Sequence, residues 1–372
     1  MKLITVVGAR PQFIKAAAVS AALSESSTIH EMLVHTGQHF DDNMSAVFFN
    51  QLGIPQPAYN LGIGNKSHGE MTGAQLIALE KVFLQEQPDW VMVYGDTNST
   101  LAAALAASKL KIPVAHVEAG LRSFNRDMPE EINRVLTDRI SNLLLAPTEQ
   151  AIRNLIKEGV PEDWCYNVGD VMYDAALMFA ALSRDKSKIL ADLNLEAHEY
   201  ILLTVHRAEN TDCPVRLKAI LSALKELSET VQIVWPIHPR TRKQIRTWGL
   251  EEEIGAQIRL IDPLGYLDMV MLEQHAVCIV TDSGGVQKEA FFYQIPCVTL
   301  RDETEWTELV DSGWNRLVSP GRGDVAAEGI RAAIGSQGVP IHPYGDGHAS
   351  DRIVSLLIEK GAERRRKGNE CR

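Results

Sequence analysis

The chain has 372 residues, a length that suits two domains of roughly 170 residues, each large enough for a core of its own. Its net charge of -11 argues against general binding of nucleic acid, and no apolar run of about 18 residues and no basic-then-apolar leader points to a membrane or to export. Five cysteines without C-x-x-C or Cys/His spacing exclude a disulfide framework and a metal site, so we predict a cytoplasmic protein.

Apolar runs typical of buried strands alternate with helical patterns, which predicts parallel α/β sheets. This alternation occurs twice, with a polar, turn-rich break at 161–174. We predict two domains, 1–170 and 171–345, and then a segment 346–372 whose helix packs back on the first domain before a disordered basic end. The predicted strands are 3–7, 31–35, 90–94, 114–117 and 143–146, then 200–205, 231–237, 257–261, 277–281 and 297–300, and the clearest helices are 73–85, 98–109 and 348–360.

Acids and guanidinium groups gather behind the strand at 114–117. Glu118 and Arg122 follow its carboxyl end, where open α/β sheets bind their ligands. Pro129 suits the first position of a helix whose first turn carries Glu130. A capped helix with an ordinary pair between Glu130 and Arg134 would explain this segment equally well. Further polar clusters along the chain favour an active site.

The first of these clusters follows the strand at 3–7. Gly8 forms a tight turn, Pro11 begins a helix, and Arg10 and Lys15 flank its first turns. Free backbone N–H groups and two cations could therefore face one anion, such as a diphosphate. The alternative is a surface Arg and Lys near a helix start, because G-x-R-P-x-x-x-K is not a Walker loop.

A second cluster places Asp96 at a strand end directly before a helix, where it could also serve only the helix cap. In the second half, His206 with Arg207, and then His238, stand at two successive strand ends. A single histidine is usually structural, but two in such positions favour a site.

The last cluster is a strand, a small-residue turn and a helix start at 280–289. Ser283, Gly284 and Gly285 would let phosphate oxygens approach backbone donors, and Glu289 could accept hydrogen bonds from ribose hydroxyls. Turns of this kind also exist for packing alone.

Together these segments resemble the non-hydrolysing UDP-N-acetylglucosamine 2-epimerase family, and the resemblance covers nearly the whole chain. The motifs that carry it are G-A-R-P-Q-F-I-K at 8–15, T-G-Q-H at 36–39, G-D-T at 95–97, H-V-E-A-G-L-R at 116–122, P-E-E-I-N-R at 129–134, H-R-A-E-N at 206–210, D-S-G-G-V-Q-K-E at 282–289 and P-Y-G-D-G at 343–347. The resemblance implies two Rossmann-like domains facing across a cleft, as in GT-B glycosyltransferases, a homodimer, and no cofactor.

The resemblance also implies roles for single residues. Those expected to perform the chemistry are Asp96, Glu118, Glu130 and His206. Those expected to bind UDP or the sugar are Arg10, Lys15, Arg122, Arg134, Arg207, His238, Leu264, Met269, Ser283, Gly284, Gly285 and Glu289, with Leu264 and Met269 at the uracil. No metal ligand is expected.

The chemistry of a UDP-2-acetamido sugar gives a reason for this set. The C2 hydrogen of the sugar is not acidic until UDP leaves C1, so we expect elimination to a 2-acetamidoglucal and re-addition of UDP. Two acid/base groups on opposite faces are needed, together with positive groups that stabilise the departing diphosphate. A nicotinamide route would need a dinucleotide loop, and no G-x-G-x-x-G follows any predicted strand.

Departures from the family pattern leave the sugar open. Trp306 stands where the pattern has a ligand-contacting Arg, and the segment 168–174 is more like the subgroup that epimerises UDP-2,3-diacetamido-2,3-dideoxy-glucuronate. The alternatives are therefore UDP-GlcNAc and this uronate. Gln38-His39 matches part of the family's regulatory UDP-GlcNAc site, but 40–42 does not. A hydrolysing epimerase, a GT-B glycosyltransferase and a non-catalytic nucleotide-sugar binder are the alternative functions.

Overall fold

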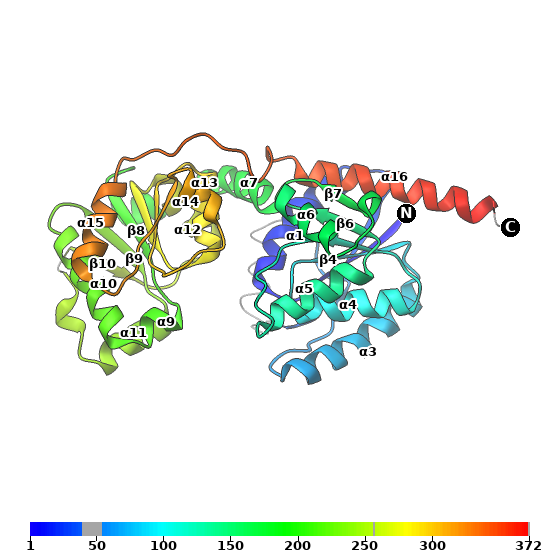
Figure 1. The fold of residues 1–372 in the computed structure, drawn as a ribbon, viewed down its shortest axis with the longest axis horizontal. Helices are drawn as coiled ribbons and strands as arrows, with labels where there is room; N and C mark the ends of the chain where they lie inside the picture. Colours follow the sequence, from blue (N-terminus) through cyan, green and yellow to red (C-terminus); the bar gives the residue numbers. More distant parts are fainter. Residues whose placement is uncertain (39–53, 256, 371–372) are drawn as a thin grey trace. The chain divides into compact units, whose positions relative to one another are not determined.

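The computed structural model describes residues 1–38, 54–255 and 257–370. The chain forms two compact units (Figure 1). Unit 1 comprises Met1–Ala175 and His342–Arg372, and unit 2 comprises Ala176–Ile341. The predicted boundaries were 170/171 and 345/346. The chain leaves unit 1 inside helix α7 (Val171–Lys186), because the first residues of this helix pack with unit 1 and the rest with unit 2.

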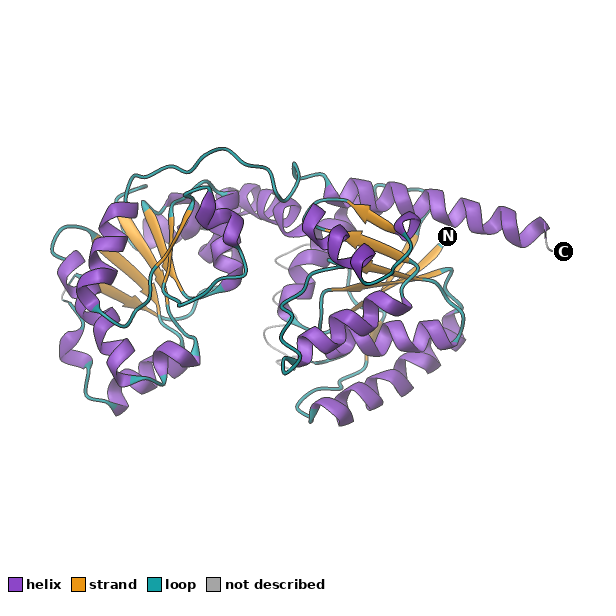
Figure 2. Cartoon of the chain, viewed as in Figure 1, coloured by secondary structure: helices purple, strands orange, loops and turns teal. Residues whose placement is uncertain are grey.

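Unit 1 is built on a seven-stranded parallel sheet of order β3-β2-β1-β4-β5-β6-β7. Helices cover both faces of the sheet (Figure 2), so its inner strands are buried on both sides and consist of nearly continuous apolar runs. The elements of unit 1 before α7 are β1 (Lys2–Val7), α1 (Arg10–Ser24), β2 (His30–His35), β3 (Tyr59–Asn60), α3 (His68–Glu86), β4 (Trp90–Tyr94), α4 (Asn98–Lys109), β5 (Val114–Val117), α5 (Pro129–Ile140), β6 (Leu143–Ala146), α6 (Glu149–Lys157), the 3-10 turn Glu162–Trp164 and β7 (Cys165–Asn167).

Helix α4 lies against both α3 and α5. Its alanines Ala102, Ala103, Ala106 and Ala107 are almost completely buried. Small side chains let the neighbouring helices approach the sheet closely, and alanine has the highest intrinsic helix propensity. Thr97 caps the helix through a hydrogen bond from the N–H of Thr100 to its hydroxyl.

Unit 2 repeats the arrangement with a six-stranded parallel sheet of order β10-β9-β8-β11-β12-β13. Its core lies on both faces of this sheet and contains the fully buried Trp235 and Tyr200. The elements of unit 2 after α7 are α8 (Ile189–Asp192), β8 (Tyr200–Thr204), α9 (Ala208–Thr211), α10 (Pro214–Leu227), β9 (Gln232–Pro236), α11 (Pro239–Thr247), the 3-10 turn Glu251–Glu253, β10 (Ile258–Ile261), α12 (Tyr266–His275), β11 (Cys278–Thr281), α13 (Gly284–Phe292), β12 (Cys297–Thr299), α14 (Thr307–Asp311), β13 (Asn315–Leu317) and α15 (Gly323–Ala333).

All ten predicted strands are confirmed, each within one residue at either end. The prediction missed β3, β7 and β13, which lie at the outer edges of the two sheets. These strands have only two or three residues and one neighbour each, so they lack the apolar run that identifies an inner strand. The segment 161–174, in which the domain boundary was predicted, contains β7 and the start of α7.

The C-terminal segment forms helix α16 (Ala349–Glu370), which packs on α1. The carboxylate of Asp174 accepts hydrogen bonds from the backbone N–H groups of Ala349 (3.2 Å) and Ser350 (2.7 Å), which fixes the first turn of the helix. The basic run 364–367 belongs to this helix, so the predicted disordered end is wrong. None of the described helices combines the length and apolar character needed to cross a lipid bilayer.

Candidate active site

In each unit the strand order reverses between two neighbouring strands, β1 and β4 in unit 1 and β8 and β11 in unit 2. The loops that leave the carboxyl ends of these strands lie beside each other, which is where open parallel sheets bind ligands. Asp96 follows β4 and Glu118 follows β5 in unit 1, and His206 follows β8 in unit 2.

In unit 1, Lys15 of α1 forms an ion pair with Glu118. Both side chains are largely buried, with exposed fractions of 11% and 13%. Burial lowers the pKa of Lys15, but attraction to Glu118 and then to Asp96 outweighs this effect and raises the pKa above its ordinary value. The amine therefore stays charged, and it holds the Glu118 carboxylate at the end of β5.

The turn after β1 differs from the predicted anion site. The side-chain oxygen of the buried Gln12 accepts the N–H groups of Gly8 (2.8 Å) and Ala9 (3.0 Å), which the prediction left free for a diphosphate. The Gln12 amide nitrogen donates to the carbonyl of Tyr94 (2.7 Å), so this residue joins the turn to the end of β4. The exposed Arg10 lies at the first position of α1. The predicted cradle of free N–H groups at this helix start is therefore wrong.

Asp96 is held by Arg134 of α5. The guanidinium donates from Nη2 (2.7 Å) and Nε (3.0 Å) to the same oxygen of Asp96, and its Nη1 lies 2.7 Å from Glu131. Burial raises the pKa of Glu131, but hydrogen bonds from the N–H groups of Ser123 and Phe124 and from Arg134 lower it below its ordinary value overall. Glu131 is thus an ionised anchor for Arg134 and for the loop before α5.

Glu130 stands next to this anchor, at the second position of α5. Its carboxylate is partly exposed and makes no hydrogen bond or ion pair with any residue that the structure describes. The two neighbouring glutamates therefore have different environments: Glu131 is committed to the fold, and Glu130 is available to a ligand.

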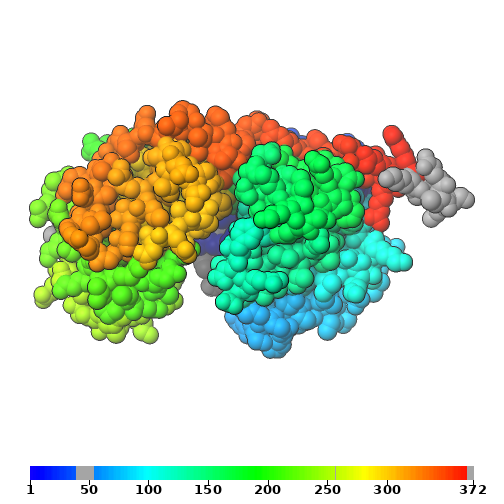
Figure 3. Space-filling model, in the orientation of Figure 1, coloured from blue at the N-terminus to red at the C-terminus, as the bar shows by residue number. Residues whose placement is uncertain are grey.

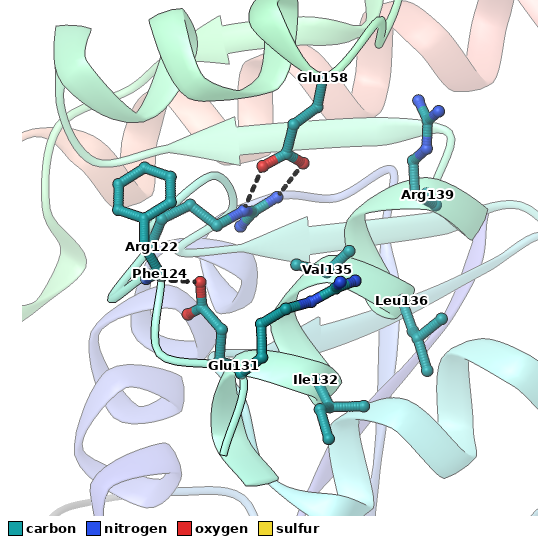
Figure 4. Close-up of a pocket in the computed structure, with 9 residues that line it drawn as sticks. Arg122, Phe124, Glu131, Ile132, Val135, Leu136, Arg139 and Glu158 are labelled. Carbon is teal, nitrogen blue, oxygen red and sulfur yellow. Dashed lines mark hydrogen bonds and ion pairs between the residues drawn. The ribbon is translucent and has the colours of Figure 1, made fainter. Parts of the chain in front are cut away.

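Arg122 does not have the open position that was predicted for a substrate-binding residue. Its side chain is only 1% exposed, and its guanidinium donates two hydrogen bonds of 2.7 Å to Glu158 (Figure 4). It also forms an ion pair of 2.8 Å with Asp138. Both carboxylates are satisfied within the fold, which favours a structural role. Arg122 lines one wall of a hollow of about 480 Å³, together with the exposed apolar side chains of Phe124, Ile132 and Leu136.

In unit 2, the completely buried Asp282 at the end of β11 organises the loop after β8. It accepts the N–H groups of His206 (3.1 Å) and Arg207 (2.9 Å) and the side-chain amide of Asn210 (3.1 Å). The His206 ring is about half exposed, and its Nδ1 lies 3.6 Å from Asp282. His238, the cap of α11, lies with its ring centroid 6.3 Å from that of His206. Burial, and then the charges of His206 and Arg240, lower the pKa of His238.

The start of α13 is the turn that was predicted to bind phosphate oxygens. The backbone N–H groups of Gly284, Gly285 and Val286 have no acceptor among the described residues, and Ser283 stands at the cap. Trp306 donates from its ring nitrogen to the carbonyl of Gly284 (3.0 Å). The Lys288 amine lies over the Trp306 ring, 4.5 Å from the ring centroid, in a cation–π contact. A cation thus lies close to this helix start although Trp306 itself carries no charge.

Glu289 lies further along α13, where it is almost buried. The Tyr266 hydroxyl donates to it at 2.9 Å. Burial, and then the charge of Glu289, raise the pKa of the fully buried Glu273 well above its ordinary range. Carboxylate oxygens accept hydrogen bonds, so Glu289 stays the candidate residue for the ribose hydroxyls.

The remaining predicted residues have less specific surroundings. Leu264 and Met269 are half-buried and pack against the core beside β8 and β11. Among the described residues, the guanidinium of Arg207 makes only a long contact of 3.8 Å with Glu209. Gln38 accepts the hydroxyl (2.8 Å) and the N–H (3.1 Å) of Ser99, whereas 39–42 of the predicted regulatory site lies outside the described residues. Within 1–38, 54–255 and 257–370, no group of His, Cys, Asp or Glu side chains could hold a metal ion.

The structure thus brings Lys15 to Glu118 and Asp96 to Arg134 in unit 1, and His206 to His238 in unit 2. The sequence interpretation missed Gln12, Glu131 and Asp138. Glu131 and Asp138 flank Arg134 on α5 at spacings of three and four residues, which places all three side chains on one face of the helix. This spacing could have indicated from the sequence that Glu131 and Asp138 lie beside Arg134.

Comparison with known proteins agrees with this architecture. The sequence profile of the family described as UDP-N-acetylglucosamine 2-epimerase matches residues 21–358. A UDP-2,3-diacetamido-2,3-dideoxy-D-glucuronate 2-epimerase of Pseudomonas aeruginosa is 53% identical over 96% of this chain and 100% of its own. A UDP-N-acetylglucosamine 2-epimerase of Methanocaldococcus jannaschii is 46% identical over 96% of this chain and 99% of its own.

Solved structures give the same result. The structure of the UDP-GlcNAc 2-epimerase from Methanocaldococcus jannaschii matches with a TM-score of 0.87 at 45% identity, over 96% of this chain and 100% of that chain. A structure of the Neisseria meningitidis enzyme bound to UDP-GlcNAc matches with a TM-score of 0.84 at 34% identity, over 96% of this chain and 100% of that chain.

Two Rossmann-like parallel units with charged groups at the carboxyl ends of their strands define a protein of the GT-B-like fold. Within this fold class, the profile and the relatives place the chain in one family. The chain belongs to the UDP-N-acetylglucosamine 2-epimerase family, and it is an isomerase.

Asp282→Asn tests how the loop that carries His206 is held. The side-chain amide of Asn would direct N–H groups at backbone N–H donors. We therefore expect the free energy of unfolding to fall by about 2 kcal/mol or more. The matched control is Asp262→Asn, because Asp262 is 91% exposed and pairs with Arg242 at the surface. We expect a change within about 0.5 kcal/mol for the control. Urea unfolding followed by tryptophan fluorescence measures both, and equal effects would contradict the role given to Asp282.

Proposed function

We propose that this isomerase inverts C2 of a UDP-2-acetamido sugar, UDP-GlcNAc to UDP-ManNAc or its diacetamido uronate analogue, by eliminating UDP and adding it back without a cofactor. The observation that carries the proposal is the cluster at the edge of the unit 1 sheet. There, Glu118 and Asp96 are each held by a cation while Glu130 is left uncommitted. Such carboxylates can exchange protons with a sugar carbon.

The start of α13 supports the UDP part of the proposal. Its three free N–H groups suit phosphate oxygens, and the nearby Lys288 and the strand-end Arg207 add positive charge. Glu289 is placed one and a half turns along the same helix, with an oxygen that can accept ribose hydroxyls. Solved relatives bind UDP-GlcNAc, and one of them also binds UDP. We therefore assign UDP recognition to unit 2.

The chemical steps then fall to the unit 1 carboxylates. Departure of UDP from C1 gives oxocarbenium character and acidifies C2–H, one carboxylate removes the proton, and a 2-acetamidoglucal results. A second acid returns a proton to C2 from the opposite face, and UDP re-forms the bond to C1. Asp96, Glu118 and Glu130 are the candidates for these two roles, and His206 is the candidate proton donor beside the diphosphate.

Replacing each of these carboxylates by its amide tests the assignment. We expect Asp96→Asn, Glu118→Gln and Glu130→Gln each to lower turnover by about 10² or more, because the amide cannot carry the proton. Affinity for UDP should stay within about threefold, since UDP recognition lies in unit 2. Turnover is read as deuterium entering C2 of UDP-GlcNAc, or of the uronate, in D₂O.

The control for this series is Glu162→Gln, an exposed glutamate in a 3-10 turn of unit 1, which should behave like the unaltered protein. Full turnover in all three test variants would remove the acid/base assignment. Free sugar among the products would indicate a hydrolysing enzyme, and transfer to an acceptor would indicate a glycosyltransferase. No deuterium in either sugar nucleotide would refute the proposed reaction.

The identity of the sugar is a separate question, and similarity to a named relative favours the uronate. The Pseudomonas aeruginosa relative named for it is 53% identical. Trp306 lies at the start of α13 where the family pattern has an Arg, so the carboxylate of a uronate must find its cation elsewhere. An Arg at this position would attract an anionic group of the substrate. With Trp306 in its place, a substrate carboxylate has to pair with Arg207 or with another cation.

We expect kcat/KM for UDP-2,3-diacetamido-2,3-dideoxy-glucuronate to equal or exceed that for UDP-GlcNAc. The reason is that a site built for a carboxylate leaves its positive groups unpaired when the substrate lacks one. Comparison of the two sugars under identical conditions gives the answer. A preference of about 10²-fold or more for UDP-GlcNAc would assign the simpler sugar.

A homodimer and a cytoplasmic location complete the proposal. Helices α3, α4 and α5 form one continuous face of unit 1 (Figure 3), and large apolar side chains are exposed along α5 and its preceding loop. Phe124 is 70%, Ile132 50% and Leu136 47% exposed. A second copy of the chain would remove these side chains from water.

Light scattering with size-exclusion chromatography tests the dimer. Ile132→Asp should convert a dimer to a monomer at micromolar concentration, because it places a charge in the proposed contact. Val215→Asp is the control, since Val215 is 70% exposed in unit 2. A monomeric unaltered protein, or a dimer that Ile132→Asp leaves intact, would contradict this face as the contact. Separation of cell membranes from cytosol tests the location.

A further inference from the structure

An almost completely buried pair of titratable side chains, His116 and Asp138, lies next to the loops of the unit 1 carboxylates and takes no part in the proposed reaction steps. His116, the third residue of β5, and Asp138, on α5, are both inaccessible to solvent. Nδ1 of His116 lies 2.7 Å from one oxygen of Asp138, and Nε2 lies 2.7 Å from the backbone carbonyl oxygen of Gly95. Both ring nitrogens therefore face oxygen atoms.

A carbonyl oxygen can only accept a hydrogen bond, and an ionised carboxylate can only accept as well. A neutral imidazole has one donor and one acceptor nitrogen, so it cannot satisfy both partners. Reversing the ring does not help, because both partners are acceptors. The hydrogen bonds are satisfied when His116 carries a proton on each nitrogen. Its charge then alternates with those of Asp138, Arg122 and Glu158, which are joined by contacts of 2.8 and 2.7 Å.

His116 forms a hydrogen bond with the loop that carries Asp96, and Asp138 accepts one from the loop that carries Glu118. Gly95 immediately precedes Asp96, and Asp138 uses its second oxygen to accept the N–H of Gly120 (3.1 Å), two residues after Glu118. Gly95, Glu118 and Gly120 all have positive φ, at 62°, 70° and 80°. For Glu118 this conformation costs free energy, so the surrounding contacts must hold the loop in place.

We propose that His116 and Asp138 form a buried positioning pair, in which the doubly protonated ring fixes the loop of Asp96 through the Gly95 carbonyl while Asp138 fixes the loop of Glu118 through Gly120. The inference rests on the proposed function for the roles of Asp96 and Glu118. His116 touches no substrate. It sets the place of carboxylates that do.

Two amide substitutions separate the two ends of the ring. The amide of Gln reaches the position of Nε2 and can donate to the Gly95 carbonyl, whereas the amide of Asn reaches the position of Nδ1 and can donate only to Asp138. We expect His116→Gln to keep kcat within about threefold of the unaltered protein. His116→Asn should lower kcat by about 10- to 100-fold with KM and the Kd of UDP little changed, because misplacing a reacting group by about 1 Å has an effect of this size.

The control is His35→Gln, which alters another buried histidine of the same sheet, at the end of β2. We expect it to lower the unfolding temperature without the loss of kcat. Equal kcat in His116→Gln and His116→Asn, or full kcat in both, would overturn the positioning role. The loss of kcat relative to the decrease in unfolding temperature should be larger for His116→Asn than for His35→Gln. An equal ratio in the two variants would also overturn the positioning role.

A measurement without turnover tests the pair itself. With ¹⁵N-labelled histidine, the signal absent from His116→Gln belongs to His116, and it should show a proton on each ring nitrogen. Asp138→Asn should remove the double protonation. An unprotonated ring nitrogen in the unaltered protein would overturn the proposal whether or not the protein is an epimerase. Double protonation in a protein that exchanges no C2 proton would support the pair and refute the proposed reaction instead.

Discussion

The parallel direction of every strand is the constraint on which the rest of the molecule depends. A parallel sheet sends the carboxyl ends of all its strands to one edge, and each strand end is followed by a loop and the start of a helix. Groups far apart in the sequence, such as Lys15, Asp96 and Glu118, then lie beside each other. The cost is a sheet whose inner strands must be buried on both faces, which explains their nearly continuous apolar runs.

The charged groups at these sheet edges differ between the two units. In unit 1, Glu118, Asp96 and Glu131 are each matched by a cation or by backbone N–H groups, which reduces the repulsion among these acidic groups. In unit 2, the principal positive feature is the start of α13, where backbone N–H groups act in place of side chains. A protein with a net charge of -11 can thus offer a local site for a polyanion.

Several groups that look alike in sequence have opposite roles in the structure. Glu130 and Glu131 are neighbours, but only Glu131 is buried against backbone donors. The helix starts of α1 and α13 both follow a strand and a small-residue turn. At α1 the donors are taken by Gln12, and at α13 they remain open. Local sequence therefore identifies where a site can form, and the contacts decide what each group does.

The sequence by itself determined the two parallel sheets, because buried inner strands require apolar runs and these runs alternate with helical patterns along the chain. It also determined the family, because many short motifs occur in the family's order. The edge strands β3, β7 and β13 could not be predicted, since two or three residues with one neighbour need no special composition. The network of His116, Asp138, Arg122 and Glu158 was decided only by the tertiary structure. Its members come from a strand, two loops and a helix, and their charges are compatible with burial only because folding brings them into contact.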